Sequence, residues 1–297
     1  MSAVAEHKPG VKDFFSLVTF SHTIFAMPFA CIGFALAVIR EEQPVSWMLF
    51  ALVILCMIFA RNAAMGFNRY ADRKIDAQNA RTATREIPSG KIPATSALWF
   101  VILNCIGFIA TTFFINKICF YLSPVALIVV LGYSLTKRFT ALCHLILGLG
   151  LSLAPIGAFL AVTGYFEIVP LFFSFAVIFW VSGFDVIYAL QDADFDKQNK
   201  LHSIPASIGK KNALMLSKFL HLCSASFVWI AYSYGAFGTL YFIGAIFFSG
   251  LLIYQHTLVR HDDLSKVNRA FFTTNGIASV VFACFVISDL IFEWKLF

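Results

Sequence analysis

The sequence predicts an all-α, polytopic membrane protein whose helices surround a central cavity. Of its 297 residues, 60% are hydrophobic and only 13% are charged, and the mean hydropathy is +0.81. A soluble domain carries roughly twice that charged fraction, and a disordered chain is polar. Nine apolar stretches are each about 20 residues long, the length that a helix needs to cross a bilayer. Residues 1–297 are therefore expected to form a single membrane domain.

Each apolar stretch is predicted to be a helix, because lipid offers no hydrogen-bond partner to an open backbone. Three connections, at 115–117, 163–165 and 234–236, are short and contain turn or polar residues, which predicts antiparallel neighbouring helices. The seven cysteines lie in or beside apolar stretches without a C-x-x-C pair, as is typical of small lipid-phase residues. The predicted spans are 19–39, 46–70, 95–115, 118–136, 142–163, 166–191, 212–234, 237–259 and 271–292.

Lysines and arginines are concentrated in every second connection between the predicted spans. The other side receives only Arg40, Lys117 and Lys295. Basic connections face the cytoplasm under the positive-inside rule, so the N-terminus is predicted inside and the C-terminus outside. Nine spans give this parity, and the location expected is the inner (cytoplasmic) membrane. The net charge of +6 follows from this orientation, and no nucleic-acid-binding module is visible.

An acidic stripe marks the end of the second predicted span. Asn68, Asp72 and Asp76 are spaced by four, so each advances only about 40° around a helix. Arg61 returns to within about 20° of Asn68 on the same stripe. An arginine at that depth is unfavourable unless it faces a cavity and a partner. This face is therefore predicted to line a polar cavity at the cytoplasmic side.

A second acidic group ends the sixth predicted span. Asp185, Tyr188, Asp192 and Asp196 fall within about 80° of one another on a continuous helix, whereas Asp194 points to the opposite side. Two helices thus present a carboxylate pair each at the same membrane face.

Clustered carboxylates repel one another unless a multivalent cation joins them. Mg²⁺ takes oxygen ligands and typically connects one or two carboxylates to the phosphates of a substrate. Asn68 adds a neutral oxygen to this group. A single D-x-x-x-D pattern is weak, since acidic residues often flank spans as solvated charge, but two such patterns with same-face companions favour function. The sequence therefore predicts Mg²⁺ and a substrate with a diphosphate head and an apolar tail.

These motifs resemble the UbiA superfamily of intramembrane prenyltransferases. Its signatures N-x-x-x-D-x-x-x-D and D-x-x-x-D stand here as NRYADRKID (68–76) and DADFD (192–196). The resemblance extends to three further stretches, and FSHTIFAMPFA (20–30) is similar to bacterial quinone-pathway members. Lys200 departs from the small residue expected before Leu-His-Ser, and His202 stands where many relatives carry lysine. The three stretches are ARTATREIPSGKI (80–92), YSLTKRFT (133–140) and HSIPASIG (202–209).

The resemblance implies Mg²⁺-dependent transfer of a polyprenyl group from polyprenyl diphosphate to a small aromatic acid. The acceptor expected is 4-hydroxybenzoate, and a dihydroxynaphthoate of the menaquinone pathway is the alternative. The fold implied has nine helices around a cavity that opens to the cytoplasmic side and laterally to lipid. The residues implied to bind Mg²⁺ are Asn68, Asp72, Asp76, Asp192 and Asp196.

The remaining site residues are assigned by their charge and position. Arg85, Lys137 and Arg138 are expected to neutralise the diphosphate or the carboxylate of the acid. Tyr133 and Tyr188 are expected to place hydroxyl groups in the site. Two further roles stay open. The ring proton is removed either by Asp185, by the diphosphate or by water. Arg61 either binds the aromatic acid or pairs with Asp185.

Two other classes of function remain as alternatives. An ion-coupled transporter would also contain charged residues inside spans, but transport sites usually lie near the bilayer midplane, whereas these acids crowd one face. A non-catalytic isoprenoid-binding protein would retain the same ligands. Other acceptors, such as a porphyrin, are less favoured because no loop insertion marks a large ring.

Overall fold

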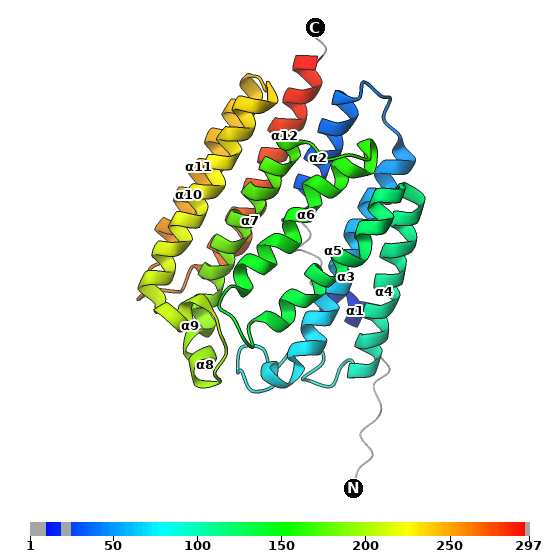
Figure 1. The fold of residues 1–297 in the computed structure, drawn as a ribbon. Coiled ribbons are helices and arrows are strands. Elements are labelled where there is room, and N and C mark those ends of the chain that lie inside the picture. The colour runs from blue at the N-terminus through cyan, green and yellow to red at the C-terminus, as the bar shows by residue number, and fades with distance from the viewer. Residues whose placement is uncertain (1–9, 19–24, 295–297) are drawn as a thin grey trace.

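The computed structural model describes residues 10–18 and 25–294, and within them every regular element is helical (Figure 1). Eight of these helices are long and apolar enough to cross a membrane. The protein is therefore a multi-pass membrane protein, as the composition predicted. The elements are α1 (Val11–Leu17), α2 (Met27–Arg40), α3 (Trp47–Asp76), α4 (Ala94–Ile115), α5 (Lys117–Thr136), α6 (Cys143–Thr163), α7 (Ile168–Ala189), the 3₁₀ turn η2 (Leu190–Asp192), α8 (Ala193–Gln198), α9 (Ile204–Ile208), α10 (Lys210–Gly235), α11 (Thr239–Leu258), the π-helical turn η3 (Arg269–Thr274) and α12 (Asn275–Trp294).

Eight predicted spans coincide with helices of this bundle. The span predicted at 46–70 was too short, because α3 continues to Asp76 and so carries the whole acidic stripe on one helix. The span predicted at 19–39 corresponds to α2, which has 14 residues and is too short to cross a membrane alone. Residues 19–24 of that span lie outside the described residues. The count of nine spans therefore stays a prediction.

The three short connections that predicted antiparallel helices are confirmed as helix ends. Asn116 separates α4 from α5, and its side-chain oxygen caps α5 by accepting the Cys119 amide at 2.9 Å. Its amide nitrogen donates to the Leu160 carbonyl of α6 at 2.8 Å, which ties two turns together. Gly164 ends α6 with φ of +73°, a left-handed conformation that glycine adopts without strain.

One half of the bundle is tightly packed around aromatic side chains. Trp180 of α7 is fully buried against Phe29 and Phe248, where α2, α7, α11 and α12 meet. A glycine on α2 allows two backbones to approach closely. A Cβ atom at Gly33 would lie 2.0 Å from the Pro155 carbonyl oxygen, so α2 and α6 touch directly there. Small residues at such contacts are typical of membrane helix pairs.

The other half of the bundle, formed by α3, α4 and α5, is packed more loosely against the rest. In the apolar part of α3 only 11% of residues are buried, compared with 61% in the span that contains α7. The helix α3 packs on α4 and α5, and α5 packs on α6, while α7 lies between α6 and α10. This arrangement leaves a space between α3 and α7, the two helices that carry the acidic motifs.

The ends of the acidic helices lie at one end of the bundle. Figure 1 shows the connection after α3, together with α8 and α9, at the lower end of the view, and the last turns of α12 at the upper end. The connection after α3 and the segment containing α8 and α9 are among those in which the sequence concentrates lysine and arginine. The face that this end presents to the cytoplasm stays a prediction from the charge pattern.

Candidate active site

A central cavity of about 910 Å³ lies between α3, α5, α6 and α7. Most of its wall is apolar, and one end is polar and charged. The predicted residues that line it are Asn68, Asp72, Asp76, Asp192, Asp196, Asp185, Tyr188, Arg61, Arg85, Tyr133 and Lys137. The structure thus brings together side chains from two acidic motifs that are more than 100 positions apart.

The carboxylate of Asp72 lies at the junction of α3 and the end of α5. It is only 2% exposed, and Lys137 contacts one oxygen at 2.7 Å while Arg138 contacts the other at 2.9 Å. A buried charge requires such partners, because its transfer out of water is otherwise very unfavourable. Arg138 also donates to the Ala71 carbonyl, and it is not among the residues lining the cavity. Lys137 is therefore better placed to reach a substrate than Arg138 is.

Asp76, one turn further along α3, is held by the loop that follows the helix. Arg85 donates to its Oδ1 at 2.8 Å, and Thr82 donates to its backbone carbonyl at 3.1 Å. The other oxygen, Oδ2, is buried and accepts no hydrogen bond from any residue in the described part of the chain. A buried carboxylate oxygen without a hydrogen-bond donor is able to accept a ligand such as a metal ion.

Asp192 is bound from the same loop, although it follows a different helix. Arg81 contacts both of its oxygens, with Nε to Oδ1 at 2.9 Å, and Asn79 donates to Oδ1 at 3.0 Å. Arg81 also donates to the Tyr188 hydroxyl at 3.0 Å. Burial lowers the pKa of Arg81, but the hydrogen bond and the charge of Asp192 outweigh it, so that pKa lies above its ordinary value.

Arg81 and Asn79 were not assigned to the site from the sequence. In the sequence, Arg81 is one of many basic residues on the predicted cytoplasmic side. It also belongs to the 80–92 stretch that carries the family resemblance. Its role depends on how the loop 77–93 folds back beneath the cavity. Spacing along the chain contains no such information.

The continuous helix expected from Asp185 to Asp196 was wrong. The helix α7 ends at Ala189, the 3₁₀ turn η2 contains Asp192, and Asp196 belongs to α8. These side chains still line one cavity, because the turn keeps them close to the end of α7. Asp194 lies outside the site, as predicted: its side chain is 80% exposed and binds Lys210 at 2.8 Å.

Asp185 and Arg61 lie deeper in the cavity and do not form the pair that the sequence left open. The Asp185 carboxylate binds His144 Nδ1 of α6 at 2.6 Å. Arg61 donates to the Val18 carbonyl at 3.1 Å. Asp185 and His144 are 41 positions apart, so no local pattern in the sequence connects the two.

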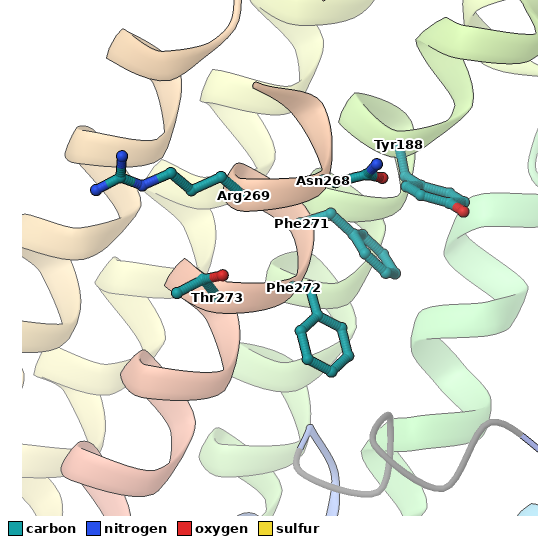
Figure 2. A pocket seen from close by; sticks show the side chains of 6 residues that line it. All are labelled: Tyr188, Asn268, Arg269, Phe271, Phe272 and Thr273. Carbon is teal, nitrogen blue, oxygen red and sulfur yellow. The ribbon is translucent and has the colours of Figure 1, made fainter. Parts of the chain in front are cut away.

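A second pocket, of about 730 Å³, adjoins the central cavity beside the π-helical turn η3 (Figure 2). Tyr188 and Phe271 line both spaces, and their ring centroids are 4.2 Å apart. Figure 2 shows these two rings next to each other, with the Arg269 side chain directed away from them. The Tyr188–Phe271 pair therefore lies between the two spaces.

The oxygen-rich end of the cavity suits Mg²⁺ bound together with a diphosphate. Within residues 10–18 and 25–294, no three acidic, histidine or cysteine side chains converge closely enough to hold an ion alone. The acids instead form two pairs, on α3 and after α7. Mg²⁺ usually combines one or two carboxylates with phosphate oxygens rather than occupying an all-protein cage. The donor set and the free oxygen of Asp76 fit that mode of binding.

Comparison with known proteins identifies the family of this chain. Residues 26–277 match the sequence profile of the UbiA prenyltransferase family. A 4-hydroxybenzoate octaprenyltransferase from Tolumonas auensis is 30% identical over 223 residues, covering 75% of this chain and 78% of that protein. A protein of the same name from Burkholderia ambifaria is 31% identical over 250 residues, covering 84% of this chain and 85% of that protein.

Solved structures share the fold over nearly the whole chain. The apo structure of a UbiA homolog from Aeropyrum pernix has a TM-score of 0.82 at 29% identity and covers 90% of this chain and 98% of that one. A UbiA homolog from Archaeoglobus fulgidus, solved with DMAPP and Mg²⁺ bound, has a TM-score of 0.72 at 18% identity, covering 94% of this chain and 99% of that one. The chain belongs to the UbiA prenyltransferase family.

Proposed function

We propose that this enzyme transfers a polyprenyl group from polyprenyl diphosphate to a small aromatic acid, with 4-hydroxybenzoate as the acceptor. The observation that carries the proposal is the pairing of carboxylates and cations at one end of an otherwise apolar cavity. Such a cavity suits an isoprenoid tail, and its charged end suits the diphosphate. The relatives named 4-hydroxybenzoate octaprenyltransferase and the homolog that binds DMAPP with Mg²⁺ support both halves of the proposal.

The charged end binds the donor diphosphate. Mg²⁺, when bound, neutralises charge that develops on the leaving diphosphate. Lysine offers a point charge to phosphate oxygens, whereas arginine offers a planar fork that binds two oxygens at once. Lys137, Arg85 and Arg81 already line this space and supply such charges. The residues that would hold the metal are Asn68, Asp72, Asp76, Asp192 and Asp196.

The acceptor ring is expected deeper in the cavity, between Arg61 and Asp185. Arg61 precedes Asp72 by 11 positions on α3, which is about 16 Å along the helix axis. Asp185 precedes Asp192 by seven positions and lies on the facing wall. The guanidinium of Arg61 suits the carboxylate of an aromatic acid. Because Arg61 lines the apolar part of the cavity away from the diphosphate end, we infer that it binds the acceptor.

The reaction exchanges one bond for another at an allylic carbon. The C–O bond to the diphosphate breaks, and the electron-rich ring carbon forms a C–C bond to the allylic carbon. Asp185 takes the proton from that ring carbon, and the diphosphate leaves with the electrons of the broken bond. Tyr133 and Tyr188 line the same space and offer hydroxyl groups to it. The apolar wall keeps water away from the allylic cation.

We place the charged end at the cytoplasmic face of the inner membrane. The connections that carry most of the lysine and arginine include the segments that form this end, and the positive-inside rule assigns such connections to the cytoplasm. Both substrates with charged groups would then reach the site from the cytoplasmic side, while the isoprenoid tail stays within the bilayer.

An acceptor panel tests the proposed reaction. The purified protein is incubated with a long-chain prenyl diphosphate and either 4-hydroxybenzoate or a dihydroxynaphthoate, with Mg²⁺ or with EDTA. We expect a prenylated 4-hydroxybenzoate that forms only with the metal. Product from the dihydroxynaphthoate alone would keep the chemistry and change the acceptor. No product from either acid, with folded protein, would contradict the proposal and favour a non-catalytic isoprenoid-binding protein.

A further inference from the structure

The carboxylate of Asp185 is held by a histidine from the neighbouring helix. His144 Nδ1 on α6 lies 2.6 Å from Asp185 Oδ2 on α7, and the two side chains are 4% and 22% exposed. The histidine is thus enclosed, whereas the carboxylate opens to the cavity. No residue of the described chain donates a hydrogen bond to the second oxygen of Asp185.

The tautomer of His144 follows from its second contact. The backbone N–H of Ile204 donates to His144 Nε2 at 3.3 Å. An amide N–H only donates, so Nε2 must act as the acceptor, and the proton of the neutral ring resides on Nδ1. His144 therefore donates to Asp185 and leaves that carboxylate as an acceptor.

The histidine is also fixed by its surroundings. Ser182 of α7 donates to the His144 backbone carbonyl at 3.1 Å. The segment that carries Ile204 is held in turn, because the His202 amide donates to the Lys137 carbonyl at 2.7 Å. A flip of the imidazole would lose the contacts of both ring nitrogens. This places Asp185 in one orientation before any substrate binds.

We propose that His144 is a positioning residue that acts through Asp185 and keeps its second oxygen directed at the acceptor ring as the proton acceptor. The inference rests on the proposed prenyl transfer and deepens it. His144 itself does not take the proton, since Nε2 is occupied by Ile204 and the ring is enclosed. In the step, the ring C–H proton passes to Asp185 Oδ1, and the C–H electron pair restores the aromatic system.

The test compares two substitutions of one residue. In His144→Asn the side-chain amide occupies roughly the place of Nδ1 and retains a donor to Asp185, whereas His144→Leu removes it. Both are assayed with the acid that the wild type prenylates, either unlabelled or deuterated at the ring carbon that is attacked. His261→Leu, at an exposed histidine in the loop before η3, is the matched control.

We expect His144→Leu to lower kcat by roughly 10- to 100-fold, as misplacement of a reacting group does. The KM for the prenyl diphosphate stays unchanged, since its head group binds elsewhere. A normal isotope effect from ring deuteration appears in His144→Leu, because slow proton removal limits the rate. It is absent or small in the wild type, in His144→Asn and in the control.

A double-mutant cycle separates positioning from a general loss of structure. In an Asp185→Asn background, His144→Leu should cause little further loss of kcat, because residues that act as a unit are not additive. Equal losses in both backgrounds, or a lower kcat without any isotope effect, would overturn the inference. If His144→Leu does not fold, the isotope effects of His144→Asn and Asp185→Asn are compared. An isotope effect that is larger in Asp185→Asn than in His144→Asn supports the inference, and equal isotope effects overturn it. An inactive wild type would instead contradict the proposed function itself.

Discussion

Arg81, in the loop after α3, binds both carboxylate oxygens of Asp192, in the turn after α7. This contact joins the two acidic motifs at the end of the cavity, although 111 positions separate the residues. Arg81 also donates a hydrogen bond to the Tyr188 hydroxyl, so its contacts extend from Asp192 to the aromatic wall of the cavity. The loop after α3 is thus part of the candidate active site and not only a connection.

Substitution of Arg81 should weaken binding of the donor. Because each hydrogen bond to a charged group contributes about 1.5–3 kcal/mol, Arg81→Ala is expected to lower kcat/KM for the prenyl diphosphate by roughly 10- to 100-fold. Lys91→Ala, at an exposed cation of the same loop, should leave kcat/KM unchanged. Steady-state kinetics over a range of diphosphate concentrations measures both. Similar losses in the two variants would indicate a general charge effect.

Removal of the metal should stop turnover without unfolding the protein. Three carboxylates of the site have protein cations as partners, namely Lys137, Arg85 and Arg81, so they do not depend on a metal for neutralisation. EDTA is therefore expected to abolish product formation while the Tm in detergent changes little. Thermal unfolding with EDTA and with Mg²⁺ checks this. A large fall in Tm with EDTA would show that the metal is part of the fold.

The close contact between α2 and α6 should be sensitive to a single methyl group. Gly33→Ala would place Cβ 2.0 Å from the Pro155 oxygen, so a backbone must move. Overpacking of this kind destabilises by about 1–3 kcal/mol. Gly157→Ala is the matched control, because nothing lies within 4 Å of its Cβ position. Thermal unfolding should show a lower Tm for Gly33→Ala alone, and equal Tm values would contradict the close packing.

Asp289 should contribute to stability and not to catalysis. Its carboxylate, 1% exposed, accepts the backbone amides of Gly238 at 2.7 Å and Tyr241 at 3.0 Å, and so caps α11 from α12. Asp289→Ala leaves two amide groups without this partner, and we expect the free energy of unfolding to fall by about 1–3 kcal/mol. Activity per folded molecule should remain, since Asp289 does not line the cavity. Asp262→Ala, at an exposed aspartate, is the control.

Much of this molecule could be predicted from local periodicity. Hydropathy located eight of the helices, and the spacing of Asn68, Asp72 and Asp76 placed them correctly on one face of α3. The break after Ala189 could not be predicted, because no proline or glycine marks the sequence from Tyr188 to Asp192. Leu190, in this turn, is fully buried in a cluster with residues of other helices, a contact between elements that local sequence does not contain.

Contacts between helices were the part that the sequence did not contain. The His144–Asp185 pair and the Arg81–Asp192 pair depend on how separate elements rotate against each other. Periodicity gives the face of one helix, but not the partner which that face meets. The π-helical turn before α12 is a further example. The side-chain amide of Asn275 donates to the Ala270 and Phe271 carbonyls, and these carbonyls come within its reach only when the turn has formed.

The most direct measurement of the central claim compares Asp192→Asn with Asp194→Asn across a Mg²⁺ titration. Both remove one charge from neighbouring positions, but only Asp192 lines the cavity, whereas Asp194 is exposed. The account predicts that Asp192→Asn lowers prenylation by at least the roughly 10- to 100-fold that loss of a residue supporting a metal site costs. Asp194→Asn should keep the activity and the Mg²⁺ dependence of the wild type. Full activity of Asp192→Asn at every Mg²⁺ concentration would contradict the metal-dependent mechanism.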